Sequence, residues 1–322
     1  MPQPHREIAQ RSSADAALAG NAVTADLIAV LVAVTQAQPR VLTIQCGCAL
    51  PSGPFKTIHR SLQSGLRDWV EQQTRHPLGY VEQLYTFADR DRDHVHSISV
   101  SYLGLTQEAR PPGDQDASWR TWYAFFPWED HRAGSPAIIS ETILPHLDVW
   151  AAAGGASAAD RKRRVAITFA SPSGWDEELV LQRYELLWEA GLVPEARRDA
   201  NTDPGEAPVP GQAMVLDHRR ILATGIARLR AKIKYRPVVF ELMPPAFTLL
   251  QLQRSVEAIA GRLVHKQNFR RLMEQEELVE ETGETAQDTG GRPAKLFRFR
   301  RNVLVERDVA GTKLPLAPVA RG

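Results

Sequence analysis

Two groups of side chains in this sequence have the types and spacing needed for chemistry with phosphates. In the first, Asp68, Glu71 and Gln72 stand at positions that share one face of a helix. Carboxylates at such a spacing can hold Mg²⁺ ions that neutralise a diphosphate during its hydrolysis. In the second, basic and amide side chains gather near the start of a predicted helix, the end that a recognition helix presents to the DNA major groove. These residues are Lys266, Gln267, Asn268, Arg270 and Arg271.

The sign of the charge changes in blocks along the C-terminal part of the chain. Residues 262–273 hold four bases and no acids, residues 274–288 hold seven acids and no bases, and residues 290–301 hold five bases. Lysine and arginine against phosphate supply affinity for DNA that falls with salt. We therefore include Arg292, Lys295, Arg298 and Arg300 among the predicted DNA contacts. The alternative, that these blocks are solvated faces of an ordinary small helical domain, stays open.

The elements that would position the second group form a winged helix-turn-helix pattern. Thr248 followed by Gln251 has the spacing of a capping box, which predicts a helix that Gly261 ends. Thr248 joins the predicted DNA contacts at this helix start. A second helix is predicted from Lys266, with Phe269, Leu272 and Met273 facing the core. The turn at 290–293 and the alternating strand at 295–300, with Phe297 and Phe299 on one face, predict a β-hairpin wing.

The first group would lie on an amphipathic helix that begins near Ser61 and follows a loop at 49–54. Two β-branched runs upstream, 27–34 and 40–45, predict a hairpin, and 97–103 alternates as a strand. Residues 50–74 resemble a Nudix box, the phosphate-binding motif of the Nudix family. Gly53, Arg67 and Glu71 match its spacing, while His59, Asp68, Gln72 and Thr74 depart from it.

The Nudix resemblance implies a ligand-binding face, whose residues are Gly53, His59, Arg67, Asp68, Glu71 and Gln72. Since an aspartate is shorter than the expected glutamate and an amide carries no charge, we expect Mg²⁺ to bind weakly or not at all. No residue is assigned a catalytic role, and neither a permanent metal site nor a cofactor is predicted. A coincidental arginine and glutamate on an ordinary amphipathic helix is the alternative.

Residues 240–301 together with the Nudix-like segment resemble the Nudix-related transcriptional regulators of NAD metabolism. This resemblance implies an α/β (α+β) two-domain chain, a Nudix-like α/β/α sandwich followed by a C-terminal winged helix-turn-helix. It also implies a homodimer on a palindromic double-stranded DNA operator, with ADP-ribose or a related NAD metabolite as effector. The predicted organisation is a flexible tail at 1–21, an effector domain at 22–235 elaborated over about 133–212, a DNA-binding domain at 236–308, and a tail at 309–322.

Two other functions fit parts of the sequence. The first is an active Mg²⁺-dependent Nudix pyrophosphohydrolase of ADP-ribose-like nucleoside diphosphates, in which Asp68 and Glu71 suffice for the metal. The second is a protein that binds nucleic acid without an effector. Cys46 and Cys48 with His94 and His96 could supply four zinc ligands, but the usual two-residue separation of the cysteines is missing.

Composition sets broad limits on the class of protein. Of 322 residues, 43% are hydrophobic and 24% charged, as in ordinary globular proteins, and the net charge of +1 confines any DNA affinity to local blocks. The apolar runs are too short for a membrane span and the N-terminus lacks a signal-peptide pattern, so we expect a cytoplasmic protein without membrane partners.

The middle of the chain gives further expectations about structure. The aromatic stretch 119–128 predicts a strand, either in the core or stacking on an adenine, with the core as the favoured interpretation. A basic cluster at 161–164 is expected to lie in an exposed turn. The remaining segments are predicted as a linker at 151–160, a strand at 165–169, a helix at 176–192, a long loop at 195–212 and a helix at 217–232.

Overall fold

The structure is a computed structural model that describes residues 24–76, 78–79, 81–87, 97–108, 116–171, 174–203, 205, 207–235, 238–286 and 293–300. The two predicted tails, the histidines His94 and His96, and Arg292 lie outside these ranges. Among the described helices, none combines the length and apolar character that a membrane crossing requires.

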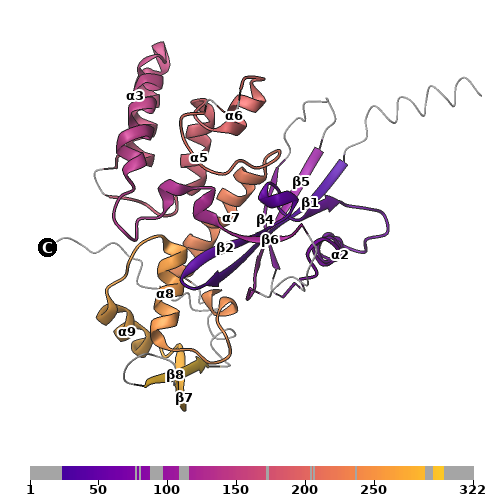
Figure 1. Ribbon diagram of the computed structural model, residues 1–322, viewed down its shortest axis with the longest axis vertical. Helices are drawn as coiled ribbons and strands as arrows, with labels where there is room; N and C mark the ends of the chain where they lie inside the picture. The colour runs from indigo at the N-terminus through magenta and orange to yellow at the C-terminus, as the bar shows by residue number, and fades with distance from the viewer. Residues whose placement is uncertain are drawn as a thin grey trace, which may run out of the picture.

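A mixed sheet of six strands forms the centre of the N-terminal half (Figure 1). Its strands run in the order β4-β5-β1-β2-β6, with β3 paired to β1; β1 and β5 are parallel, and the other pairs are antiparallel. The bounds are β1 Thr24–Thr35, β2 Gln38–Thr43, β3 Ser52–Pro54, β4 Val81–Phe87, β5 Ser97–Leu105 and β6 Ser118–Thr121. The predicted hairpin is confirmed as β1–β2, and β3 adds a short strand within the predicted loop.

Strand β1 is buried on both faces, which makes it the centre of two hydrophobic cores. Leu27 and Leu31 pack with Leu66 and Val70 of α2 (Leu62–Thr74) on one side of the sheet. The side chains between them belong to a larger core with the helices on the other side. Because side chains alternate across a strand, one continuous apolar run fills both layers. The predicted α/β/α layering is confirmed.

The larger core is covered by a helical layer that sequence analysis only partly predicted. Its helices are α3 Leu144–Ala152, α4 Ala158–Thr168, α5 Val180–Glu189, α6 Pro194–Asp199 and α7 His218–Tyr235, with a π-helical turn at Ile139–Ile143 before α3. The helices predicted at 176–192 and 217–232 are confirmed as α5 and α7. Figure 1 shows α5 and α7 beside the sheet and α3 farther out.

Several predictions for this middle region are wrong. The segment predicted as a strand at 165–169 lies at the end of α4 instead, where Val165, Thr168 and Phe169 are buried at helical spacing. The predicted linker at 151–160 is confirmed only over 153–157, which connects α3 to α4. The basic cluster before them lies on this helix and not in a turn. The predicted long loop begins with α6, and Val209 later in it is fully buried.

The aromatic stretch forms core structure rather than a ligand wall. Strand β6 ends at Thr121, and short 3-10 turns at Trp122–Ala124 and Pro127–Glu129 follow. Trp122, Phe125, Phe126 and Trp128 are completely buried. The core interpretation is confirmed, and these four side chains cannot stack on an adenine, since no part of them is exposed.

The C-terminal elements are the predicted two helices and hairpin, preceded by a 3-10 turn at Val238–Leu242. They are α8 Leu249–Ala260, α9 Lys266–Gln275, β7 Val279–Ala286 and β8 Ala294–Phe299. Phe247 pairs with Phe297 through backbone hydrogen bonds of 3.0 and 2.8 Å, and its ring lies 4.9 Å from that of Phe299. These contacts hold the hairpin against the segment that enters α8. Helix α8 also packs on β1, β2 and α7.

Candidate nucleic-acid interface and ligand-binding face

Helix α8 is capped at both ends by the residues predicted for it. The Thr248 hydroxyl accepts a hydrogen bond from the Gln251 amide at 3.2 Å, and the Gln251 side chain accepts one from the Thr248 amide at 2.7 Å. Gly261 ends the helix with φ of 72°. The Thr248 side chain is therefore engaged in the cap, and only 6% of the residue is exposed. The structure does not bring it to the surface with the predicted DNA contacts of α9.

Helix α9 divides cleanly into an inner and an outer face. Phe269 and Met273 are buried, and Leu272 is half-buried. The five predicted contacts on this helix are all exposed, and no hydrogen bond or ion pair joins them to other described residues; they are Lys266, Gln267, Asn268, Arg270 and Arg271. Three of them are cations and two are amides, the side-chain types that contact phosphates and read base edges.

The hairpin wing carries its own counter-charges. Lys295 pairs with Glu281 at 2.7 Å, and Arg298 pairs with Glu280 at 2.7 Å. Arg300, just beyond β8, pairs with Glu277 at 2.6 Å. Each acid comes from β7 or from the turn before it, so acids of the acidic block pair with the three described bases of the second basic block. All six side chains are at least 40% exposed.

A buried charge network, which sequence analysis missed, fixes α8 to the helical layer. Glu129 accepts hydrogen bonds from Arg183 at 2.6 Å and from Arg230 at 2.5 Å, and all three side chains are at most 1% exposed. Burial alone would raise the pKa of Glu129, but the two guanidinium groups hold it below its ordinary value. Arg230 also donates to the Ile259 carbonyl of α8 at 2.9 Å.

Two further contacts hold the C-terminal end of α8 to the same region. The Tyr123 hydroxyl donates to the Ala258 carbonyl at 2.7 Å, and the His131 amide donates to the Gly261 carbonyl at 2.7 Å. A Cβ at Gly261 would lie 2.4 Å from the Glu129 carbonyl oxygen, so glycine is required there by space as well as by φ. The first helix of the DNA-binding unit is thus attached rigidly to the rest of the molecule.

The predicted ligand face is formed by α2 and the loop before it. Gly53 lies directly against Trp69, where a Cβ would approach the indole to 2.3 Å. The His59 ring accepts a hydrogen bond from the Lys56 amide at 3.1 Å. Arg67 donates to the carbonyl oxygens of Leu78 and Gly79, which ties the helix to the segment that follows it. The His59 and Arg67 side chains therefore already have hydrogen-bond partners, and Gly53 has no room for a side chain.

The remaining residues of this face are Asp68, Glu71 and Gln72, and all three are exposed on α2. The neighbouring Gln73 fixes the loop by accepting from the Ser52 amide at 3.0 Å and donating to its carbonyl at 2.7 Å. Within the described part of the chain, no cluster of three or more histidine, cysteine, aspartate or glutamate side chains is arranged to hold a metal ion. Asp68 and Glu71 are the two carboxylates on this face that could contact one.

A family of known proteins matches the C-terminal elements. Residues 239–299 match the family model described as the NrtR DNA-binding winged helix domain. The C-terminal domain is an NrtR winged helix. The match lies inside the predicted domain at 236–308, whose exact bounds stay a prediction.

One curated relative shares part of the sequence. Over 86 residues the chain is 42% identical to the "ADPR responsive transcriptional repressor NtrR" of Acinetobacter baylyi, a stretch that covers 27% of this chain and 34% of the relative. The chain therefore matches about a third of that protein's length, and the whole relative's activity does not transfer by this match alone.

Two solved structures superpose on most of this chain. Shewanella oneidensis NrtR complexed with a 27mer DNA superposes with a TM-score of 0.55 at 19% identity, covering 89% of this chain and 99% of that one. A MutT/nudix family protein from Enterococcus faecalis gives a TM-score of 0.50 at 16% identity, with 87% of each chain covered. At such identities the likeness shows the fold. The predicted resemblance to Nudix-related regulators, a Nudix-like domain followed by an NrtR winged helix, is confirmed.

Proposed function

We propose that this chain is a transcriptional repressor of NAD-metabolism genes that binds a palindromic DNA operator as a homodimer. The observation that carries the proposal is the outer face of α9, the second helix of an NrtR winged helix. It exposes two amides and three cations that have no ion-pair partner among the described residues. Cations supply affinity for phosphates, and arginine and amide groups near the start of a recognition helix can discriminate bases.

The effector in this proposal is ADP-ribose or a related NAD metabolite, bound on the Nudix-like face of α2. The name of the Acinetobacter baylyi relative, which describes a repressor that responds to ADPR, supports this choice. An effector can change operator affinity only if it prefers one arrangement of the winged helices over another. Strand β1 contacts both α2 and α8, which gives such a preference a route to the DNA-binding unit.

We further infer that the chain acts as a regulator and not as a pyrophosphohydrolase. The helix face offers Asp68 and Glu71 as carboxylates, while Gln72 adds no charge and Arg67 is engaged with backbone carbonyls. Two exposed carboxylates can attract a hydrated Mg²⁺ ion but give little control over its position. The Gln72 amide and the Nε2–H of His59, whose Nδ1 accepts from Lys56, are the donors on this face that can hydrogen-bond a diphosphate.

Operator selection followed by fluorescence anisotropy tests this function. Duplexes are first selected from a random library with the full-length protein, and the affinity of the best one is then measured with and without ADP-ribose. We expect tight, salt-dependent binding that ADP-ribose shifts. The double variant Arg270→Ala/Arg271→Ala should lose binding, whereas Arg163→Ala, an exposed arginine of α4 paired with Asp160, should retain it.

The hydrolase alternative is tested in parallel by incubating the protein with ADP-ribose and Mg²⁺ and measuring AMP. Rapid AMP release that Glu71→Gln abolishes would overturn the assignment as a regulator without hydrolase activity. Selection of no duplex above the random pool would overturn the assignment as a DNA-binding protein.

A further inference from the structure

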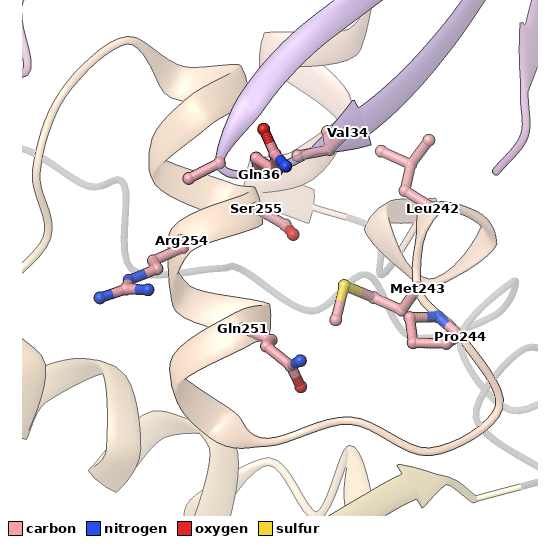
Figure 2. Close-up of a pocket in the computed structure, with 9 residues that line it drawn as sticks. Val34, Gln36, Leu242, Met243, Pro244, Gln251, Arg254 and Ser255 are labelled. Atoms are coloured by element: carbon pink, nitrogen blue, oxygen red, sulfur yellow. The ribbon is translucent and has the colours of Figure 1, made fainter. Parts of the chain in front are cut away.

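A cavity lies between the sheet and the winged helix, away from the α2 face. Its volume is about 520 Å³, within the range of small-molecule sites. One wall is the turn between β1 and β2, and the others are α8 and the segment after the 3-10 turn at Val238–Leu242 (Figure 2). Its lining residues are Val34, Gln36, Ala37, Leu242, Met243, Pro244, Gln251, Arg254 and Ser255.

Ser255 supplies a hydroxyl group that points into this cavity. The residue is 8% exposed, and its hydroxyl has no hydrogen bond to any described residue. In Figure 2 its side chain points from α8 into the space opposite the Met243 thioether. Other helical hydroxyls in the molecule are bonded one turn back: Thr74 donates to the Val70 carbonyl at 2.7 Å. The Ser255 oxygen is accessible from the cavity, so its hydroxyl can donate a hydrogen bond to an occupant.

The turn that forms the opposite wall is held in an unfavourable conformation. Gln36 and Ala37 have φ of 52° and 57°, although neither is glycine or asparagine. Arg132 fixes the turn by donating to the Ala37 carbonyl at 2.5 Å and to the Gln38 side chain at 3.1 Å. Backbone strain of this kind persists where surrounding contacts enforce it and is concentrated at ligand sites.

The chemistry of the lining selects a class of ligand. Ser255, Gln36 and the free amide nitrogen of Gln251 can donate hydrogen bonds, and no lining residue is acidic. Arg254 adds a positive charge at the margin, pointing outward in Figure 2, and no ion pair engages it within the described ranges. Val34, Leu242, Met243 and Pro244 form an apolar surface on the other side.

We propose that this cavity is a second binding site, distinct from the α2 face, for a small organic anion that combines an apolar ring with a carboxylate or sulfonate group. The anionic group meets the Ser255 hydroxyl and the amides, and the ring packs on the Met243 and Pro244 side. The walls belong to both the sheet and the winged helix, so an occupant contacts both.

The test uses 8-anilinonaphthalene-1-sulfonate, which is fluorescent in apolar sites, with the full-length protein. We expect saturable binding of about one probe per chain, with competition by benzoate. Gln36→Glu, an isosteric change at an exposed residue, should weaken binding roughly fivefold to tenfold, and Gln36→Lys should strengthen it. Ser255→Val should weaken it roughly tenfold, provided that its thermal unfolding matches the wild type.

Gln63→Glu, an exposed residue of α2, is the matched control and should leave the affinity unchanged. ADP-ribose is added as a competitor, which separates this site from the proposed effector face whether or not ADP-ribose binds there. Equal probe affinity in wild type, Gln36→Glu and Ser255→Val would overturn the proposal. Displacement of the probe by ADP-ribose, unchanged by Glu71→Gln, would overturn the claim of a second ligand.

Discussion

The molecule uses the same pair of chemical groups, arginine and glutamate, in two opposite environments. At the junction of α8 with the helical layer, Glu129 is buried with Arg183 and Arg230 at distances of 2.6 and 2.5 Å. In the wing, Arg298 and Glu280 are equally close at 2.7 Å but largely exposed. Distance alone therefore does not distinguish a structural ion pair from an exchangeable one; the exposure to water does.

The difference in exposure decides whether an arginine holds the fold in place or can bind a DNA phosphate. The buried network fixes where the DNA-binding unit lies, and its cations have no access to a phosphate. The wing pairs stabilise little, because water and salt screen them, so a DNA phosphate can replace the glutamate as the partner of the arginine. The acidic strand β7 then competes with DNA for the wing bases.

The largest expected effect comes from breaking the buried network. Glu129→Gln removes the one negative charge between Arg183 and Arg230, and it should lower the free energy of unfolding by about 3–5 kcal/mol. Glu280→Gln makes the same chemical change in the wing and should alter that free energy by less than about 0.5 kcal/mol. Urea denaturation at neutral pH measures both, and equal losses would contradict the comparison.

His218 shows the effect of burial separately from that of a charged partner, because burial is the cause of its pKa shift. The His218 ring accepts a hydrogen bond from the Leu50 amide at 2.9 Å, and burial lowers the pKa of His218 from 6.5 to about 4. The folded state therefore binds the proton less readily than the unfolded state. Above pH 6.5, His218 is neutral in both the folded and the unfolded state, and its full contribution to the free energy of unfolding is present. This contribution falls as the pH drops from 6.5 to 4 and then levels off.

Between pH 6.5 and pH 4 the free energy of unfolding should fall by about 3 kcal/mol, which corresponds to the size of the His218 pKa shift. His76 and His131 also have pKa values lowered by burial, so the difference between wild type and His218→Asn isolates the contribution of His218. The variant keeps an acceptor for the Leu50 amide and should show a shallower decline. Urea midpoints measured from pH 7 to pH 4 give the two slopes, and parallel slopes would rule out this role for His218.

The features that sequence predicted well are those set by neighbouring residues. The capping box of Thr248 and Gln251 and the stop at Gly261 depend on contacts within one helix, so their spacing was sufficient. The α4 region was predicted wrongly because its β-branched residues outweighed the helical spacing of Val165 and Phe169. Burial against α3 and α5 decides the conformation of that segment.

The buried network could not be predicted, since Glu129 lies 54 residues from Arg183 and 101 from Arg230. The wing pairs are different. An acidic block and a basic block on the two sides of a predicted hairpin already imply opposite charges on facing strands. That signal is present in the sequence, in the same charge order that predicts the DNA contacts.

The next largest effect is on operator affinity. It distinguishes the exposed arginines of α9 from the wing arginines that have an ion-pair partner. Arg270→Ala and Arg271→Ala should each weaken operator binding by about 1–3 kcal/mol, because nothing in the described chain competes for these side chains. Arg298→Ala should cost less, since Arg298 leaves Glu280 when it binds phosphate. Fluorescence anisotropy at one fixed salt concentration compares the three. A larger loss for Arg298→Ala would show that the wing is the main contact.

The smallest expected effect tests the exchange of partners in the wing. Glu280→Gln frees Arg298, and Glu281→Gln frees Lys295, so each variant should bind the operator more tightly than wild type, by less than about 1 kcal/mol. The gain should be largest at low salt, because an exposed pair is screened as ionic strength rises. The double variant should change the slope of log affinity against log salt by no more than about 1.8, if two phosphate contacts are added.

Glu71→Gln, which also removes one exposed carboxylate but lies on α2, controls for net charge. An equal gain from Glu71→Gln would mean that only the overall charge matters and that β7 does not compete locally with DNA.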